Sequence, residues 1–148
     1  MKIRTSIAAA GAAALIGGTG ALLLPAAASA HSVTHTLKFT AIQQKSINFS
    51  KTTGASADQD VNSAGKIIGF DEIYFAFNPK TNTATGGVTL DINGGFLYGT
   101  LNLNTQGPVM HGKVTGGTGT FKGATGTITA KNLNKNGTRT AVTIVYTS

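Results

Sequence analysis

Apolar and polar residues alternate along most of the chain after residue 30. Over residues 33–41, apolar side chains and His35 occupy every second position, and threonine and lysine occupy the positions between them. Such alternation is typical of a β-strand with one buried face. The same period returns at 96–104 and 139–147, whereas helical periodicity is almost absent. The pattern therefore predicts an all-β protein.

Segments rich in glycine, asparagine and proline separate the alternating stretches. Asn93-Gly94 is a strong hairpin signal because both residues tolerate the positive φ of a tight turn, and Pro79 has no N–H to give to a sheet. The polar, aperiodic stretch 50–63 is expected to be a long loop. Seven or eight strands, about ten to fifteen residues apart, indicate an antiparallel barrel or sandwich. Glycines inside the strands favour a barrel, because they allow strands to bend sharply.

The first thirty residues have the pattern of an export signal. Lys2 and Arg4 give a positive start, an uncharged run covers 7–28, and Ala28-Ser29-Ala30 offers the small residues of a cleavage site. A membrane anchor is the alternative, because the uncharged run is long enough to span a bilayer, but glycines within it and Pro25 disfavour that interpretation. We expect cleavage after Ala30, a single mature domain over 31–148, and a secreted bacterial protein that does not span a membrane after cleavage.

Composition narrows the chemistry. The chain has no cysteine, which excludes disulfides, thiol catalysis and cysteine metal sites. His31 and His35 would lie about 13 Å apart on a strand at ~3.3 Å per residue, too far to share a metal ion, and we predict no metal. The formal net charge of +7 falls to +5 without the signal, and the basic residues are scattered singly. This distribution indicates a solvated exterior and no nucleic-acid partner, with attraction to an anionic cell wall as an option.

One glycine-threonine run carries a family resemblance. Residues 115–130, TGGTGTFKGATGTITA, resemble the Gly-Gly-Thr/Ala-Gly-x-Phe/Tyr-x-x-Ala-x-Gly run of the allene oxide cyclase barrel family, whose architecture plant dirigent proteins share. The segments GKIIGFDEIYF at 65–75 and FLYGTLNL at 96–103 resemble further strands of that family. The matching positions in the run are Gly116, Gly117, Gly119, Phe121, Ala124 and Gly126.

The resemblance implies an eight-stranded antiparallel β-barrel with a partly filled lumen, often assembled as a homodimer or homotrimer. Cyclases of this family close a reactive fatty-acid epoxide in an apolar cavity, and dirigent proteins steer the coupling of phenolic radicals. Both act as steric moulds without a redox cofactor, so the expected partner is a small hydrophobic or aromatic molecule. The cyclases have an acidic residue on their first strand, where this chain has only Gln43 and Gln44.

Asp71 is the best candidate for a catalytic group. It shares parity with three apolar residues of the same segment, so it would lie at one end of a lumen-facing row, and a carboxyl against an apolar wall has a raised pKa. The alternative is an aspartate at the barrel rim that is hydrogen-bonded to the backbone. The apolar residues expected to face the lumen and bind a ligand are Ile73, Phe75, Phe77, Leu97, Leu101 and Leu103.

Other polar and aromatic side chains are weaker candidates. Parity places Tyr98 and His111 on the outside and Tyr146 in the core, while His35 lies on the apolar face of the first strand as a core or lumen histidine. Asp58 and Asp60, in the expected loop, lack the repeated acids of a calcium site.

Three hypotheses about function remain open. The protein is a mould that binds a small molecule and directs its cyclisation or coupling, an isomerase or cyclase that uses Asp71, or an envelope or interaction module with a filled lumen. The bulk of Phe75 and Phe77 favours a narrow or filled lumen.

Overall fold

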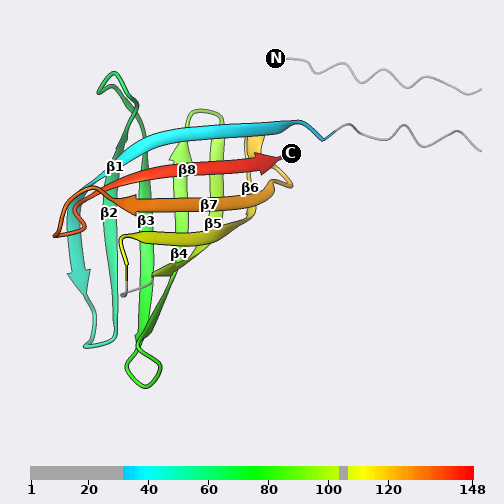
Figure 1. Cartoon of the computed structure of the whole chain (residues 1–148). Helices are drawn as coiled ribbons and strands as arrows, with labels where there is room; N and C mark the ends of the chain where they lie inside the picture. The colour runs from blue at the N-terminus through cyan, green and yellow to red at the C-terminus, as the bar shows by residue number, and fades with distance from the viewer. Residues whose placement is uncertain (1–31, 104–106) are drawn as a thin grey trace, which may run out of the picture. The chain divides into compact units, whose positions relative to one another are not determined.

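The protein is a closed antiparallel β-barrel of eight strands (Figure 1). The computed structural model describes residues 32–103 and 107–148, so the expected export signal lies outside the described residues. A single 3₁₀ turn, η1 (Gly119–Phe121), accompanies the strands. The strands are β1 (Thr34–Asn48), β2 (Thr53–Val61), β3 (Ile67–Asn78), β4 (Thr83–Ile92), β5 (Gly95–Leu103), β6 (Val109–Gly117), β7 (Thr125–Asn132) and β8 (Arg139–Thr147).

Each strand pairs with the next along the chain, and β1 closes the barrel by pairing with β8. The first part of β1 lies beside β8 and its last part lies beside β2, and a register shift between Gln43 and Lys45 marks where the strand bends. Figure 1 shows β6, β7 and β8 running across the direction of β2, β3 and β4. Full closure leaves no edge strand open to pair with another chain.

The predicted loop at 50–63 is wrong, because β2 occupies most of it. The residues of β2 that face the barrel interior are not hydrophobic but small or acidic: Gly54, Ser56, Asp58 and Asp60, all buried. The strand therefore lacks the apolar alternation from which strands are recognised. Its partners β1 and β3 hold it in the sheet through continuous pairing on both sides.

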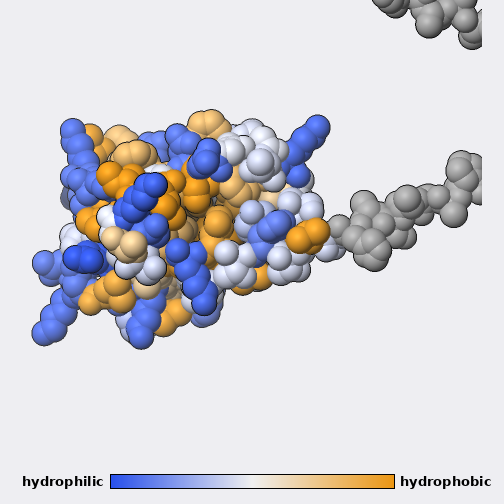
Figure 2. Space-filling model, turned by 90° about the horizontal axis from the view of Figure 1, so that it is seen from above, coloured by the Kyte–Doolittle hydropathy of each residue, from blue (hydrophilic) through white to orange (hydrophobic). Residues whose placement is uncertain are grey.

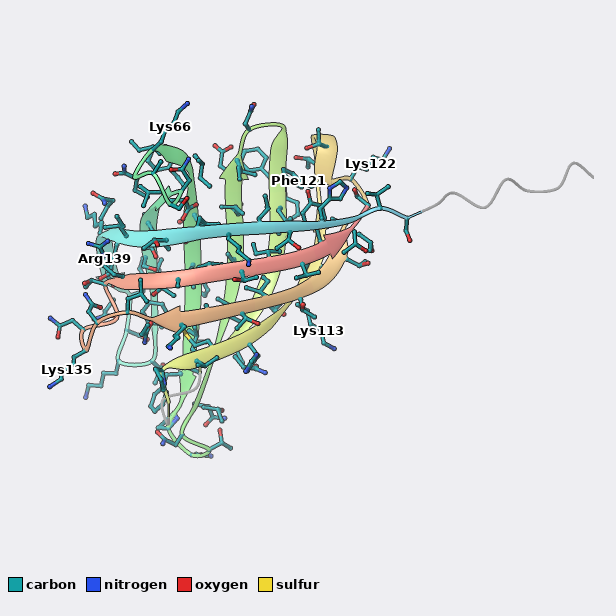
Figure 3. The ribbon with its side chains drawn as sticks, turned by 45° about the horizontal axis from the view of Figure 1, so that its top comes forward. Lys66, Lys113, Phe121, Lys122, Lys135 and Arg139 are labelled. Carbon is teal, nitrogen blue, oxygen red and sulfur yellow. The ribbon has the colours of Figure 1, made fainter. Side chains whose placement is uncertain are left out.

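The glycine-threonine run closes one end of the barrel. Gly119 has a φ of +58° and begins η1, and a side chain at Gly117 would meet the Phe121 Cβ at 2.5 Å. These two glycines let the chain turn tightly and place Phe121 against Tyr146, with ring centroids 5.6 Å apart. Both rings are buried, and Figure 3 shows Phe121 where β1 begins and β8 ends. Tyr146 is thus a core residue, as the sequence predicted.

His35 lies outside the lumen that the sequence allowed for it. It is exposed and stacks on Tyr146 with ring centroids 5.1 Å apart, so it covers the closed end of the barrel. Tyr98 and His111 are exposed as predicted.

The outer surface carries aromatic as well as polar side chains, and hydrophobic and hydrophilic groups are interspersed on the face in Figure 2. Phe70 and Tyr74 of β3 and Phe96 and Tyr98 of β5 are all exposed. Within residues 32–103 and 107–148, no helix is long and apolar enough to cross a membrane.

Candidate functional site

The barrel encloses a cavity of about 240 Å³ to which all eight strands contribute. Most of the lining is aliphatic or aromatic, with Leu90, Leu97 and Ile128 among its buried side chains. Asn132, Gly137 and Thr140 also line it, so the cavity extends toward the end of the barrel where β7 leads into β8. Figure 3 shows Lys135 and Arg139 at that same end.

Five of the six predicted lumen residues line this cavity. Ile73 and Phe75 do so from β3, and Leu97, Leu101 and Leu103 from β5. Phe77 is only partly buried and is not part of the lining, because it lies at the last turn-side position of β3, one residue before the strand ends. Their role in binding a ligand stays a prediction.

The lumen is narrow and not filled, because a cavity of about 240 Å³ remains beside Phe75. The inward positions beside it are glycines on both neighbouring strands, Gly54 on β2 and Gly86 on β4. A methyl group at Gly54 would lie 2.5 Å from the Phe75 Cζ, so the ring occupies the space that a side chain there would need. Phe75 therefore lines the cavity without filling it.

Three aspartates form a buried cluster on the inner faces of β2 and β3. Asp58 is the direct cross-strand partner of Asp71, and Asp60 lies one inward position further along β2. Asp58, Asp60 and Asp71 are 9%, 0% and 7% exposed. Asp58 and Asp71 line the cavity, whereas Asp60 is not part of the lining. When all three carboxyls are ionised, four of their oxygens have no hydrogen-bond partner: Asp58 Oδ1, both Asp60 oxygens and Asp71 Oδ1.

The structure therefore places Asp71 in the cavity wall and not at a rim where the backbone satisfies it. Its Oδ1 is buried without a partner, and Leu90 of β4 lies beside it on the side away from Asp58. Whether Asp71 acts in catalysis stays a prediction.

Burial raises the pKa of all three carboxyls, and the charge of a neighbouring aspartate raises the pKa of Asp60 and of Asp71 further. Burial first, and the Asp71 charge second, raise the pKa of Asp60 to about 8. Burial first, and the Asp58 charge second, raise the pKa of Asp71 to about 7, and burial raises the pKa of Asp58. A protonated Asp60 is placed to donate to Asp71. Because closely spaced carboxylates cannot all ionise, the cluster titrates as a unit and holds a proton at neutral pH.

Small neighbours make room for Asp60. Its inward cross-strand neighbours are Ala41 on β1 and Gly69 on β3, and a side chain at Gly69 would collide with the Asp91 carbonyl oxygen. Gln43 of β1 lies opposite Asp58. Among the described lining residues, Asp58 and Asp71 are the only ionisable ones, so no cation of the lining offsets their charge.

Asp58 and Asp60 were missed as site residues because their segment looked like a loop. One signal was present in the sequence: Ser56, Asp58 and Asp60 stand at every second position, with alanine or glutamine between them. That is strand alternation with a polar inner face, as in barrels whose lumen holds a ligand. The described residues include no group of three histidines or acids arranged to hold a metal ion.

Comparison with known proteins places the fold but not the family. No protein-family model and no curated protein matches the chain. Among solved structures, the pterocarpan synthase dirigent protein GePTS1 has a TM-score of 0.64 at 17% identity, over 78% of this chain and 88% of that one. The chain has the dirigent-type barrel fold. The resemblance in the sequence is thus confirmed at the level of the fold.

Two enzymes have similar barrels. AbnU, described as an exo-specific intermolecular Diels-Alderase, has a TM-score of 0.63 at 12% identity over 79% of this chain and 97% of its own. Pyocyanin demethylase has a TM-score of 0.61 at 16% identity over 76% and 99%. The TM-scores show that the dirigent-type barrel is shared. Because the identities are low, the comparison assigns no reaction to this chain.

Proposed function

We propose that this protein binds a small, largely apolar molecule in the barrel lumen, and that Asp71 exchanges a proton with it during an isomerisation or cyclisation that needs no redox cofactor. The observation that carries the proposal is the position of Asp71 and Asp58 in the wall of an otherwise mainly apolar cavity. Unpaired carboxyls in such a place cost stability, and costs of this kind are concentrated at functional sites.

The chemistry follows from the environment. A carboxyl with a pKa of about 7 is populated in both protonation states near neutral pH, which suits a general acid or base. Asp60 hydrogen-bonds to Asp71 when protonated and is not part of the cavity lining, so it serves as a positioning residue that holds the shared proton. The volume of about 240 Å³ lies below the roughly 300–1,000 Å³ of drug-sized ligand pockets, so the molecule is expected to be small.

The barrel neighbours support a lumen that handles small organic molecules, since their names describe a demethylase, a Diels-Alderase and a dirigent protein. These names cover different reactions, so the choice of proton transfer rests on the aspartates of this chain. A mould that binds without catalysis is the remaining alternative, and it differs in needing the cavity but not the carboxyls.

The test begins with protein purified from the culture medium of its own producer. Native mass spectrometry is expected to find a retained small molecule, and the mass of the chain is expected to correspond to a start at His31, after the export signal. The retained molecule and its analogues then serve as substrates. Asp71→Asn is expected to keep an intact lumen and, at saturating ligand, to lose turnover by about 10²–10⁴-fold, the usual contribution of a general acid or base.

Glu72→Gln is the matched control, because Glu72 is the next residue on β3 and faces outward. It should match the unsubstituted protein in binding and turnover. A ligand that is retained and converted equally by the Asp71→Asn variant would leave a mould without acid–base catalysis. Absence of any bound molecule, together with no binding of added small molecules, would refute the lumen site itself.

A further inference from the structure

The cavity lining is unusual in having acids but no bases. Asp58 and Asp71 are the only ionisable groups among the described residues that line it. The residues that face them from the neighbouring strands are Gln43 on β1 and Leu90 on β4, with Asp60 on β2 as the remaining titratable neighbour. An anionic ligand would lose its hydration and gain no cation, which is strongly unfavourable.

The aspartates of the cavity lining favour a ligand that donates a hydrogen bond. Asp58 and Asp71 both line the cavity, and one oxygen of each, Oδ1, is buried without a hydrogen-bond partner. Buried polar groups are nearly always paired, so a ligand that fits this wall presents a donor to the carboxyl groups of Asp58 and Asp71. The rest of the lining is mainly aliphatic and aromatic, so the donor belongs to a compact apolar molecule.

We propose that the lumen selects a small, apolar ligand with a weakly basic heteroaromatic nitrogen, which takes a proton from the aspartate cluster and is held as a cation between Asp58 and Asp71. The proposal rests on lumen binding and extends it to a ligand class. The same arrangement rejects carboxylates of similar shape.

The step is a proton transfer within the closed site. The O–H bond of one aspartic acid breaks, an N–H bond forms on the ligand, and the electron pair of the O–H bond stays on the carboxylate oxygen. The total charge of the cavity and ligand is unchanged. The ligand is now a cation, and it offsets the negative charge of carboxylates that had no cation beside them. A neutral hydroxyl could satisfy one acceptor oxygen, but it would leave the repulsion within the cluster as it was. This is the physical reason for preferring a basic nitrogen.

Three bicyclic probes of matched shape test the proposal: isoquinoline, naphthalene and 2-naphthoate. Their binding to the mature protein at pH 8 is measured by NMR shifts of lumen residues such as Leu97, and the protonation state of isoquinoline by its ultraviolet absorption. Free isoquinoline is neutral at this pH. We expect isoquinoline to bind more than tenfold tighter than naphthalene, with the spectrum of its protonated form, and 2-naphthoate not to bind.

Variants separate charge from shape. Asp71→Asn and Asp58→Asn should each weaken isoquinoline more than tenfold and abolish its protonated spectrum, while naphthalene binding persists and reports an intact lumen. Glu72→Gln on the outer face should change nothing. Isoquinoline that binds as the neutral form, or no tighter than naphthalene, would overturn the nitrogen selectivity and leave lumen binding standing. If none of the three probes binds, both the selectivity and the proposed lumen site fail.

Discussion

Asp60 is the residue whose ionisation the fold tolerates least. It is completely buried, lies beside Asp71, and has a pKa raised from 3.8 to about 8 by burial and by the Asp71 charge. A raised acid pKa means that the folded protein binds more protons than the unfolded chain between pH 4 and 8. Stability therefore falls as the pH rises through this range, and the loss is complete above the folded pKa. The buried cluster thus lowers the free energy of unfolding at high pH, and this loss disappears when the carboxyls are protonated at low pH.

This cost gives a pH-dependent prediction for Asp60→Asn. Each pKa unit corresponds to about 1.4 kcal/mol, so the variant should raise the free energy of unfolding at pH 9 by at least about 2 kcal/mol. At pH 5, where the Asp60 carboxyl is already protonated, the change should be below about 1 kcal/mol. Urea unfolding at both pH values measures the difference.

Asp91→Asn is the control, because Asp91 is exposed on the outer side of β4. This variant should show the same dependence of the free energy of unfolding on pH as the unsubstituted protein. An unsubstituted protein that is equally stable or more stable at pH 9 than at pH 5 would show that the three carboxyls are not buried together.

The strands differ in how well the sequence predicts them. β1, β5 and β8 were predicted because their inward positions are largely hydrophobic, and the run at 115–130 indicated the barrel type. β2 was not, because its inward residues are glycine, serine and aspartate. Asp71 was found from its parity with Ile73 and Phe75, but its partners Asp58 and Asp60 depend on the register between β2 and β3, which no local pattern encodes. The open lumen likewise depends on Gly54 and Gly86 meeting Phe75 across strands.

The close approach of β3 and β4 at Gly69 makes a prediction for the element. A methyl group at Gly69 would collide with the backbone carbonyl of Asp91, and backbone atoms cannot move aside as a flexible side chain does. Gly69→Ala should therefore lower the free energy of unfolding by about 1–3 kcal/mol, the usual cost of overpacking. It should also disturb the pocket of the adjacent Asp60.

Gly87→Ala is the matched control on β4, because a side chain there meets no atom within 4 Å. It should leave stability within about 0.5 kcal/mol of the unsubstituted protein, as surface substitutions usually do. Equal effects of the two substitutions in thermal or urea unfolding would contradict the close strand approach at Gly69.

The packed end of the barrel and the buried carboxyls lie in different parts of the molecule. One end of the barrel is packed, with Phe121 and Tyr146 in edge contact beneath His35. The cavity extends toward the other end, where β7 leads into β8. Closure of the sheet and this packed end stabilise a barrel that has no cysteines. Their contribution to the free energy of folding offsets the cost of burying the three carboxyls. This division leaves the lumen available for a ligand.

The proposed function requires that the aspartate cluster of the lumen holds a proton at neutral pH. A ¹³C NMR titration of the aspartate carboxyl carbons measures this directly, with Asp60→Asn, Asp58→Asn and Asp71→Asn to assign the signals. We predict that at least one signal of the Asp58–Asp60–Asp71 cluster remains protonated at pH 7 and titrates near pH 7–8. If all three carboxyls are ionised by pH 5, the cluster holds no proton and the central claim is contradicted.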